Sequence, residues 1–243
     1  MILTQEKILE LLFINIQTAG FYKELVGMPD VMQRLWKQRM KWEYENSNPN
    51  HYDYETLYEI KAGLYVEFSK IVAISLGKIK TTDDGQTIAT IGTLEGDNEI
   101  LLLTKLIKFL NKKSINQLCG HNIKDFILPF ILKRMIINKI ENIPNCLKIF
   151  GKKTWDISCI DTMELWKGTT NYYTSLDLLA EVLELPLRTS ELDMNIHQLY
   201  WNNELEKIIQ KSVYNVQTTI NLILRLNNLN AIDDLNKFEI KSI

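Results

Sequence analysis

The chain has 243 residues, of which 46% are hydrophobic and 24% are charged, proportions that are ordinary for a globular protein. Its 28 Lys and Arg residues nearly balance its 30 Asp and Glu residues, so the net charge of −2 indicates no nucleic-acid or acidic-membrane partner without a local patch. Ten glycines and five prolines exclude collagen-like and Pro/Gly-rich disordered proteins.

The cysteines and the N-terminal region bear on the cellular compartment. Cys119, Cys146 and Cys159 are too few and too scattered for a disulfide framework, and no Cys/His cluster has zinc spacing. The apolar stretch from Ile8 to Ile16 is interrupted by polar residues and has no basic lead-in, so it does not predict a signal peptide. No run approaches the roughly 18 apolar residues of a membrane span. We therefore expect a cytoplasmic protein with no membrane partner, whose cysteines are packing residues.

The N-terminal part of the chain predicts a strand followed by a helical insertion. Residues 11–18 form an apolar run rich in strand formers, which predicts a strand buried on both faces. Asp30 is a typical N-cap for a helix over residues 30–45, and the polar residues 46–50 predict a loop.

Two strands and then an alternation of helices and strands follow. Strands are predicted over 70–77 and 86–91, joined by a hairpin turn at Asp83-Asp84-Gly85. The later elements, in chain order, are a helix over 98–110, a strand over 115–119, a helix over 125–138, a strand over 156–160, a helix over 176–183 and a long amphipathic helix over 204–229.

This order of elements predicts an α/β fold with a mixed β-sheet flanked by helices. No internal repeat, low-complexity block or linker divides the sequence. We expect a single domain over residues 1–243 with a helical, aromatic-rich insertion at about 27–58.

Four stretches carry a resemblance to a known family: Leu12 to Thr18 (LFINIQT), Gly120 to Phe130 (GHNIKDFILPF), Asp161 to Lys167 (DTMELWK) and Ile209 to Val216 (IQKSVYNV). In this order they resemble the DEDD-type, ribonuclease-H-like 3′–5′ exonucleases, in particular the predicted 3′–5′ exonuclease family related to the proofreading domain of family-B DNA polymerases. The resemblance spans about residues 8–226 and implies the ribonuclease-H-like DEDD exonuclease fold.

Active members of that superfamily use two Mg²⁺ or Mn²⁺ ions about 4 Å apart to activate water at a phosphodiester. Four carboxylates hold these hard cations. Two lie at i and i+2 on the first strand and therefore share one face. The third begins the helix after the His-Asn motif, and the fourth lies on the last helix, about one turn after a Tyr or His that handles the attacking water.

The resemblance places these four acids at Asn15, Gln17, Ile127 and Asn215, and it places the tyrosine at Lys211. All four acids are therefore replaced. The three amides keep an oxygen but lose the charge, and Ile127 has no donor atom. We therefore expect no bound metal, no cofactor and no catalytic residue.

Neighbouring residues do not restore the lost acids. Asp125 lies two residues before position 127, about 200° away around a helix, so its side chain is expected to face elsewhere. Asp161 is interpreted as a helix cap instead of a catalytic acid. The Lys211 ammonium is a candidate to occupy the vacant metal space, close to the path of a phosphate.

The candidate nucleic-acid-binding residues are His121, Asn122, Phe126 and Lys211. For His121 and Asn122 two alternatives stay open, contact with a nucleotide or closure of the turn by local hydrogen bonds. Four other aromatic residues could stack on bases but are more typical of a core: Trp155, Trp166, Tyr172 and Tyr173.

Three functions are compatible with these observations. The first is a catalytically degenerate pseudo-nuclease that binds single-stranded nucleic acid without cleaving it, because loss of the acids relieves repulsion of phosphate. Modest basic clusters support it: Lys105, Lys108, Lys112 and Lys113; Lys133 and Arg134; Lys148, Lys152 and Lys153.

The second function is a protein-interaction or regulatory subunit, as a homodimer or beside an active nuclease or polymerase. Its contact surface would be the last helix and the aromatic residues of the insertion, namely Trp36, Trp42, Tyr44, Tyr52, Tyr54 and Tyr58. The third is a residual metal-dependent 3′–5′ exonuclease, which needs replacement ligands that the sequence does not contain.

Overall fold

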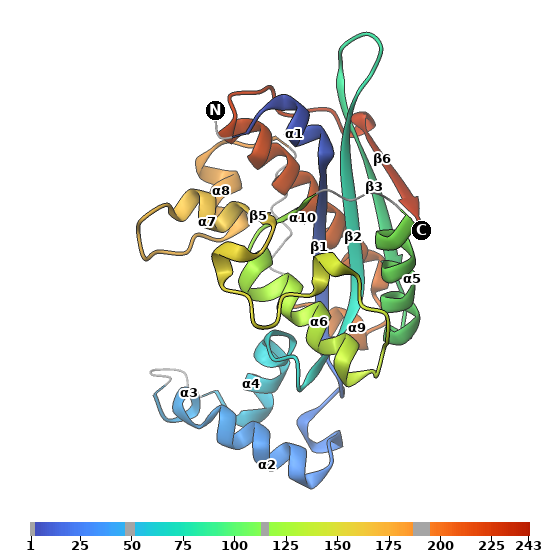
Figure 1. Ribbon diagram of the computed structural model, residues 1–243. Helices are drawn as coiled ribbons and strands as arrows, with labels where there is room; N and C mark the ends of the chain where they lie inside the picture. The colour runs from blue at the N-terminus through green and yellow to red at the C-terminus, as the bar shows by residue number, and fades with distance from the viewer. Residues whose placement is uncertain (1–2, 47–51, 113–116, 187–194) are drawn as a thin grey trace.

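The protein is described by a computed structural model that covers residues 3–46, 52–112, 117–186 and 195–243. Its centre is a mixed sheet with the strand order β5-β4-β1-β2-β3-β6, and helices cover both faces (Figure 1). The predicted α/β fold with a mixed, helix-flanked sheet is confirmed. Within the described ranges, no helix combines the length and the apolar composition that a membrane crossing requires.

The strands of the sheet are β1 (Leu11–Gly20), β2 (Ser69–Thr81), β3 (Thr87–Glu95), β4 (Gln117–Gly120), β5 (Cys159–Asp161) and β6 (Phe238–Ser242). β1 pairs antiparallel with β2 and parallel with β4, and the hairpin of β2 and β3 is antiparallel. The two edge strands, β5 and β6, are parallel to β4 and β3. The chain therefore places β1, with the first candidate motif, in the middle of the sheet.

The helices are α1 (Gln5–Glu10), α2 (Asp30–Arg39), α3 (Lys41–Asn46), α4 (Tyr54–Lys61), α5 (Glu99–Lys112), α6 (Leu128–Ile137), α7 (Thr162–Lys167), α8 (Leu176–Val182), α9 (Ile196–Trp201) and α10 (Leu205–Leu226). A π-helical turn, Ile123–Ile127, precedes α6. Figure 1 shows α5 and α6 in front of the sheet and α10 behind it.

β1 is buried on both faces, as its sequence predicts. Alternate residues of a strand point to opposite faces, so Leu12, Ile14 and Ile16 join the core under α5 and α6. Leu11 and Phe13 join the core under α10. The odd-numbered positions of β1 therefore face α10, which fixes the direction of the candidate pair that follows Phe13.

The insertion between β1 and β2 builds a small core of its own around Trp36, which is fully buried. Its ring meets those of Tyr58, Tyr65 and Phe68 edge-on, with centroids 5.1–5.8 Å apart. Trp36 and Tyr58 are therefore core residues of the insertion, and the prediction that they belong to an interaction surface is wrong.

Several predicted boundaries differ from the structure. The helix predicted over 30–45 is divided at Met40, which leaves helical geometry (φ −90°, ψ 3°) and is buried. The strand predicted over 156–160 is a short turn, Thr154–Asp156, followed by β5 at 159–161. The helix predicted over 125–138 begins as the π-helical turn. The loop predicted at 46–50 lies, except for Asn46 in α3, outside the described residues.

The cysteines carry free thiols. Cys119 and Cys159 are buried in the cores on the two faces of the sheet, and burial raises the pKa of both. The prediction that these two are packing residues is confirmed.

Candidate functional site

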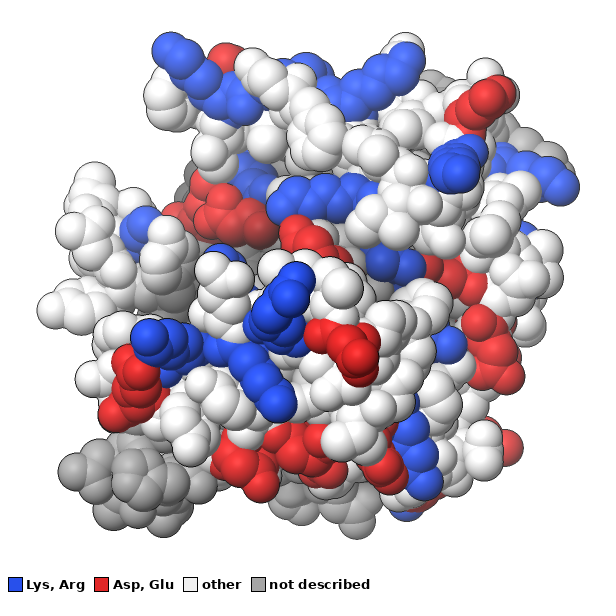
Figure 2. Space-filling model, turned by 90° about the horizontal axis from the view of Figure 1, so that it is seen from below, with Lys and Arg blue, Asp and Glu red and all other residues white. Residues whose placement is uncertain are grey.

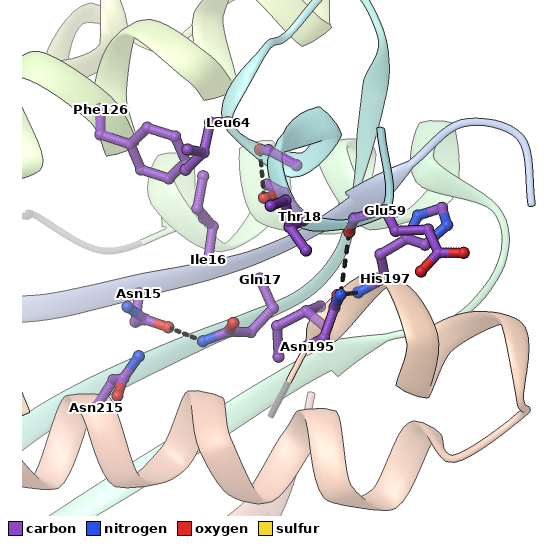
Figure 3. Close-up of a pocket in the computed structure, with 13 residues that line it drawn as sticks. Asn15, Ile16, Gln17, Thr18, Glu59, Leu64, Phe126, Asn195, His197 and Asn215 are labelled. Atoms are coloured by element: carbon purple, nitrogen blue, oxygen red, sulfur yellow. Dashed lines mark hydrogen bonds between the residues drawn. The ribbon is translucent and has the colours of Figure 1, made fainter. Parts of the chain in front are cut away.

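A pocket of about 540 Å³ opens beside the C-terminal half of β1, between α10 and the end of the insertion (Figure 3). It is lined by Asn15, Ile16, Gln17, Thr18, Glu59, Ile60, Gly63, Leu64, Phe126, Asn195, Ile196, His197 and Asn215. We call this the amide pocket, because four of these side chains are carboxamides. The Thr18 hydroxyl donates to the Gly63 carbonyl at 2.7 Å. A Cβ at position 63 would lie 2.9 Å from the Thr18 backbone oxygen, so a glycine lets the turn after α4 approach β1.

Three of the predicted positions meet in this pocket. Asn15 and Gln17 lie at i and i+2 on β1 and face α10, and the Gln17 Nε2 donates to the Asn15 Oδ1 at 2.9 Å. The Ser212 hydroxyl of α10 donates to the same oxygen at 3.3 Å. Asn215, one turn further along α10, points toward this pair in Figure 3. The side-chain oxygen of Asn15 thus accepts two hydrogen bonds, and the side-chain nitrogen of Asn15 is the group that can donate to a ligand.

Ile127 does not line the amide pocket. Its side chain is 2% exposed and belongs to the core between the sheet and α5 and α6. The preceding residue, Phe126, presents its ring to the pocket instead. Asp125 is exposed on the π-helical turn and is not a lining residue. An apolar surface therefore stands where the resemblance implies a third carboxylate.

His121 is fixed by contacts within the protein. Its Nε2 lies 3.0 Å from the Thr174 carbonyl oxygen, and its Nδ1 lies 2.9 Å from the Thr162 hydroxyl. Burial lowers the pKa of the His121 imidazole, which favours a neutral ring that donates from Nε2 and accepts at Nδ1. Of the two alternatives that the sequence leaves open for His121, local hydrogen bonding is the one that the structure shows.

The Asp161 carboxylate organises the same turn. It accepts hydrogen bonds from the backbone N–H groups of Asn122, Lys124 and Met163, at 2.9–3.0 Å. The bond from Met163 caps α7, so the prediction that Asp161 is a helix cap is confirmed. Asn122 has a left-handed backbone (φ 58°), which closes the turn before the π-helical segment.

Lys211 lies on α10 but does not enter the amide pocket. Its side chain is 12% exposed, and its ammonium pairs with the Asp177 carboxylate of α8 at 3.3 Å. The expectation that this ammonium fills the metal space is therefore wrong, because an acid on a neighbouring helix lies within its reach.

His197 lines the pocket and was not predicted as a site residue. Its Nδ1 accepts from the Gly20 N–H at 3.1 Å, and its Nε2 donates to the Lys23 carbonyl at 2.9 Å. Burial lowers the pKa of this imidazole. A lone histidine in a short polar segment gives no signal in the sequence, because its partners lie far away along the chain.

Sequence comparison identifies the family. A sequence model of the exonuclease domain of DNA polymerase family B matches residues 40–186, which is more than half of the chain. The chain belongs to this family. The matched range contains the His121 turn and Asp161, whereas Asn15, Gln17 and Asn215 lie outside it.

Solved structures also resemble this exonuclease-family chain. One is the family B DNA polymerase from the hyperthermophilic archaeon Pyrobaculum calidifontis, with 13% sequence identity and a TM-score of 0.48. The similarity covers 89% of this chain and 24% of the polymerase chain, so the protein spans about a quarter of that polymerase. No curated protein matches the sequence.

The residues at the amide pocket do not fit the pair of divalent ions that active exonucleases of the superfamily use. Such ions require anionic oxygen ligands, whereas Asn15, Gln17 and Asn215 are neutral. Glu59 is the one carboxylate among the described residues that line the pocket. In the described part of the chain, no group of three or more His, Cys, Asp or Glu side chains is placed to hold a metal ion.

On one face of this exonuclease-family protein, the basic side chains form no single patch. Figure 2 shows Lys and Arg side chains in separate groups with Asp and Glu between them. Arg134 is 3% exposed and pairs with the buried Glu99 carboxylate, so its prediction as part of a basic surface cluster is wrong. The side chains of Lys112 and Lys113 lie outside the described part of the structure.

The aromatic residues near α7 are exposed, which corrects the expectation that they belong to a core. Tyr172 is 82% and Trp155 is 74% exposed, and Tyr173 and Trp166 are also exposed. The Lys167 ammonium lies 4.2 Å from the centroid of the Tyr173 ring, and the Lys153 ammonium lies 5.1 Å from that of Trp155. The exposed rings are thus accompanied by positive charge.

Proposed function

We propose that this protein is a catalytically inactive member of the exonuclease family that binds single-stranded nucleic acid without cleaving it. The observation that carries the proposal is the Gln17–Asn15 hydrogen bond at 2.9 Å, in a pocket that stays open. At two of the positions where active relatives need anionic ligands, Asn15 and Gln17, the side chains are neutral and hydrogen-bonded to each other.

The amides favour an anion over a cation. With the Asn15 oxygen engaged by Gln17 and Ser212, the Asn15 amide nitrogen remains as a hydrogen-bond donor. Phosphate oxygens are acceptors for such donors. Carboxylates at the same positions would repel phosphate in the absence of metal ions.

The exposed aromatic residues support a single-stranded ligand. Tyr172 and Tyr173 are exposed and directly precede Thr174. The Thr174 carbonyl accepts a hydrogen bond from His121, which belongs to the motif from Gly120 to Phe130. Exposed rings can stack on unpaired bases, a contact worth about 1–3 kcal/mol per base. Lys167 beside Tyr173 adds a cation that can contact a phosphate.

The test is fluorescence anisotropy with labelled 12-nucleotide DNA and RNA single strands in the presence of EDTA. We expect binding at low salt and a steep loss of affinity between about 50 and 200 mM salt, because phosphate contacts release counterions. Asn15→Asp/Asn215→Asp should weaken binding under these metal-free conditions. Asn203→Asp/Asn228→Asp, which makes the same charge change at exposed positions, should not.

Three results would reject this proposal. Absence of binding at low salt, or binding that is insensitive to both salt and the Asn15→Asp/Asn215→Asp change, would remove the nucleic-acid ligand. Release of mononucleotides in Mn²⁺ that a chelator abolishes would contradict the loss of catalysis.

A second candidate function is a protein-interaction subunit, and a specific surface favours it. The insertion exposes large apolar side chains: Val26, Val31, Leu35, Trp42 and Leu64, of which Trp42 is 72% exposed. Exposed apolar side chains that lie close together are typical of protein contacts, and Val31 and Leu35 lie one turn apart on α2. Light scattering should then report a dimer that Trp42→Ser disrupts, whereas a concentration-independent monomer without a co-purifying protein would contradict this candidate.

A further inference from the structure

Two adjoining pockets, of about 230 and 220 Å³, lie where α5 is adjacent to β2, β3 and β6. They share Phe109 and Ile243 and have no lining residue in common with the amide pocket. Figure 1 shows this region at the β6 edge of the sheet, beside α5. We call the two pockets together the lysine groove.

The floor of the lysine groove is apolar. Leu12, Leu76 and Leu94 supply buried side chains from three neighbouring strands, and Phe109 and Ile243 separate the two pockets. The Ile243 N–H donates to the Thr93 carbonyl at 3.0 Å, which fixes Ile243 against β3.

Gly92 makes this floor possible. A Cβ at position 92 would lie 2.8 Å from the Ile243 side chain, so with any other residue at this position Ile243 would have to shift. The two pockets flank the isoleucine that occupies this space.

The rim of the groove is positively charged. Its charged lining residues in the described part of the chain are all lysines: Lys78, Lys80, Lys105, Lys108 and Lys241. The strand register places Lys78 opposite Thr90 and Lys241 opposite Gly92, so β2, β3 and β6 present these groups on one face. All five side chains are exposed.

Little of this positive charge is neutralised within the described protein. Lys241 pairs with Glu239 at 3.0 Å, and Lys105 donates to the Ile243 carbonyl at 3.2 Å. Within the described ranges, Lys78, Lys80 and Lys108 form no ion pair. Lys78, Lys80 and Lys108 therefore contribute positive charge around an apolar floor.

We propose that the lysine groove docks an acidic segment of another protein, whose apolar side chains enter the two pockets and whose Asp and Glu side chains pair with the lysines. Each pocket has the size of a large aliphatic or aromatic side chain. A phosphodiester backbone would be attracted by the lysines, but the polar edges of nucleobases would find no hydrogen-bonding side chain on the apolar floor. The combination of charge and apolar floor therefore favours an acidic, amphipathic peptide over nucleic acid.

The probe is a fluorescein-labelled 14-residue peptide in which Glu and Asp alternate with Leu and Phe, measured by anisotropy at low salt. We expect Lys78→Glu/Lys80→Glu to lower the affinity at least about tenfold, because close like charges replace opposite ones. Lys37→Glu/Lys133→Glu makes the same charge change at exposed lysines elsewhere and should have little effect. Ile243→Ser, which leaves the charge unchanged, should also weaken binding.

Three comparisons decide between the outcomes. The same peptide with Ser in place of Leu and Phe should bind more weakly, and equal binding would contradict an apolar contact. No binding of the original peptide, or equal losses in the two Lys→Glu variants, would overturn the proposal. A single-stranded oligonucleotide that displaces the peptide and loses its own affinity in Lys78→Glu/Lys80→Glu would show that the groove binds nucleic acid instead.

This inference does not depend on the proposed function. Oligonucleotide binding at the amide pocket should be retained in Lys78→Glu/Lys80→Glu and lost in Asn15→Asp/Asn215→Asp. Each proposal can therefore fail while the other stands.

Discussion

At the amide pocket, Asn15, Gln17 and Asn215 have nearly the shape of the carboxylates that the resemblance implies at these positions, and they differ in charge and in hydrogen-bond donors. A strand period of two residues was enough to predict that Asn15 and Gln17 lie side by side. The position of Lys211 was not predictable in this way. A long charged side chain pairs with whichever acid the tertiary structure brings near, here Asp177.

The two described histidines provide a test of burial at the level of single residues. Burial lowers the pKa of both His121 and His197 from the ordinary value of 6.5. We expect their Cε1–H resonances in an NMR titration to change with midpoints below pH 6.5. A midpoint at or above 6.5 for either ring would contradict its placement.

The same shifts have a consequence for stability. Because the folded state disfavours protonation of these rings, their contribution is complete above the unfolded pKa. It is lost as the pH falls from about 6.5 toward the folded pKa. Urea titrations across this range should therefore show the free energy of unfolding decreasing with falling pH.

Asp161 joins two elements through one buried carboxylate. Asp161→Ala would leave the N–H groups of Asn122, Lys124 and Met163 without their acceptor, and we expect a loss of about 3 kcal/mol in the free energy of unfolding. Asp161→Asn keeps one acceptor oxygen and should lose less. Equal losses in the two variants, measured by urea denaturation, would contradict this role.

At the scale of elements, a buried ion pair connects β2, α5 and α6. The Arg134 guanidinium donates to both oxygens of Glu99 and to the Val66 carbonyl, and the Ile71 N–H also donates to Glu99. Arg134→Met should cost about 3–5 kcal/mol, because it leaves a buried carboxylate without its cation.

The matched control is Arg134→Met/Glu99→Gln, which removes the charge but keeps an oxygen acceptor for Ile71. We expect this double variant to be more stable than Arg134→Met alone. If denaturant midpoints show the double variant to be the less stable of the two, the buried charge is not the source of the loss.

Elements with a strong local pattern were predicted well, including the seven-residue α8, whereas several elements of five or six residues were not. The amphipathic period of α10 and the apolar runs of β1 and β2 predict these elements from local sequence alone. α1, α9 and β6 have five or six residues each, and contacts with the sheet stabilise them. The break at Met40 was not predicted either, because the local sequence continues the helical pattern across it.

For the whole molecule, the alternation of helices and strands predicted the fold class, and the motifs predicted four residues that line the amide pocket: Asn15, Gln17, Phe126 and Asn215. The lysine groove was not predicted because it joins parts of the chain that are far apart in sequence. Lys105 and Lys108 were recognised as a cluster, but only the pairing of β2, β3 and β6 brings Lys78, Lys80 and Lys241 beside them. The exposure of Tyr172 and Trp155 likewise depends on tertiary packing.

Calorimetric titration with Mn²⁺ measures whether the amide pocket binds metal ions, and the proposed function requires that it does not. Asn15→Asp/Gln17→Glu/Asn215→Asp is the matched variant, because it restores three carboxylates at unchanged positions. We expect saturable Mn²⁺ binding in this variant and none in the unaltered protein up to millimolar concentration. Saturable binding of two Mn²⁺ ions by the unaltered protein would contradict the account.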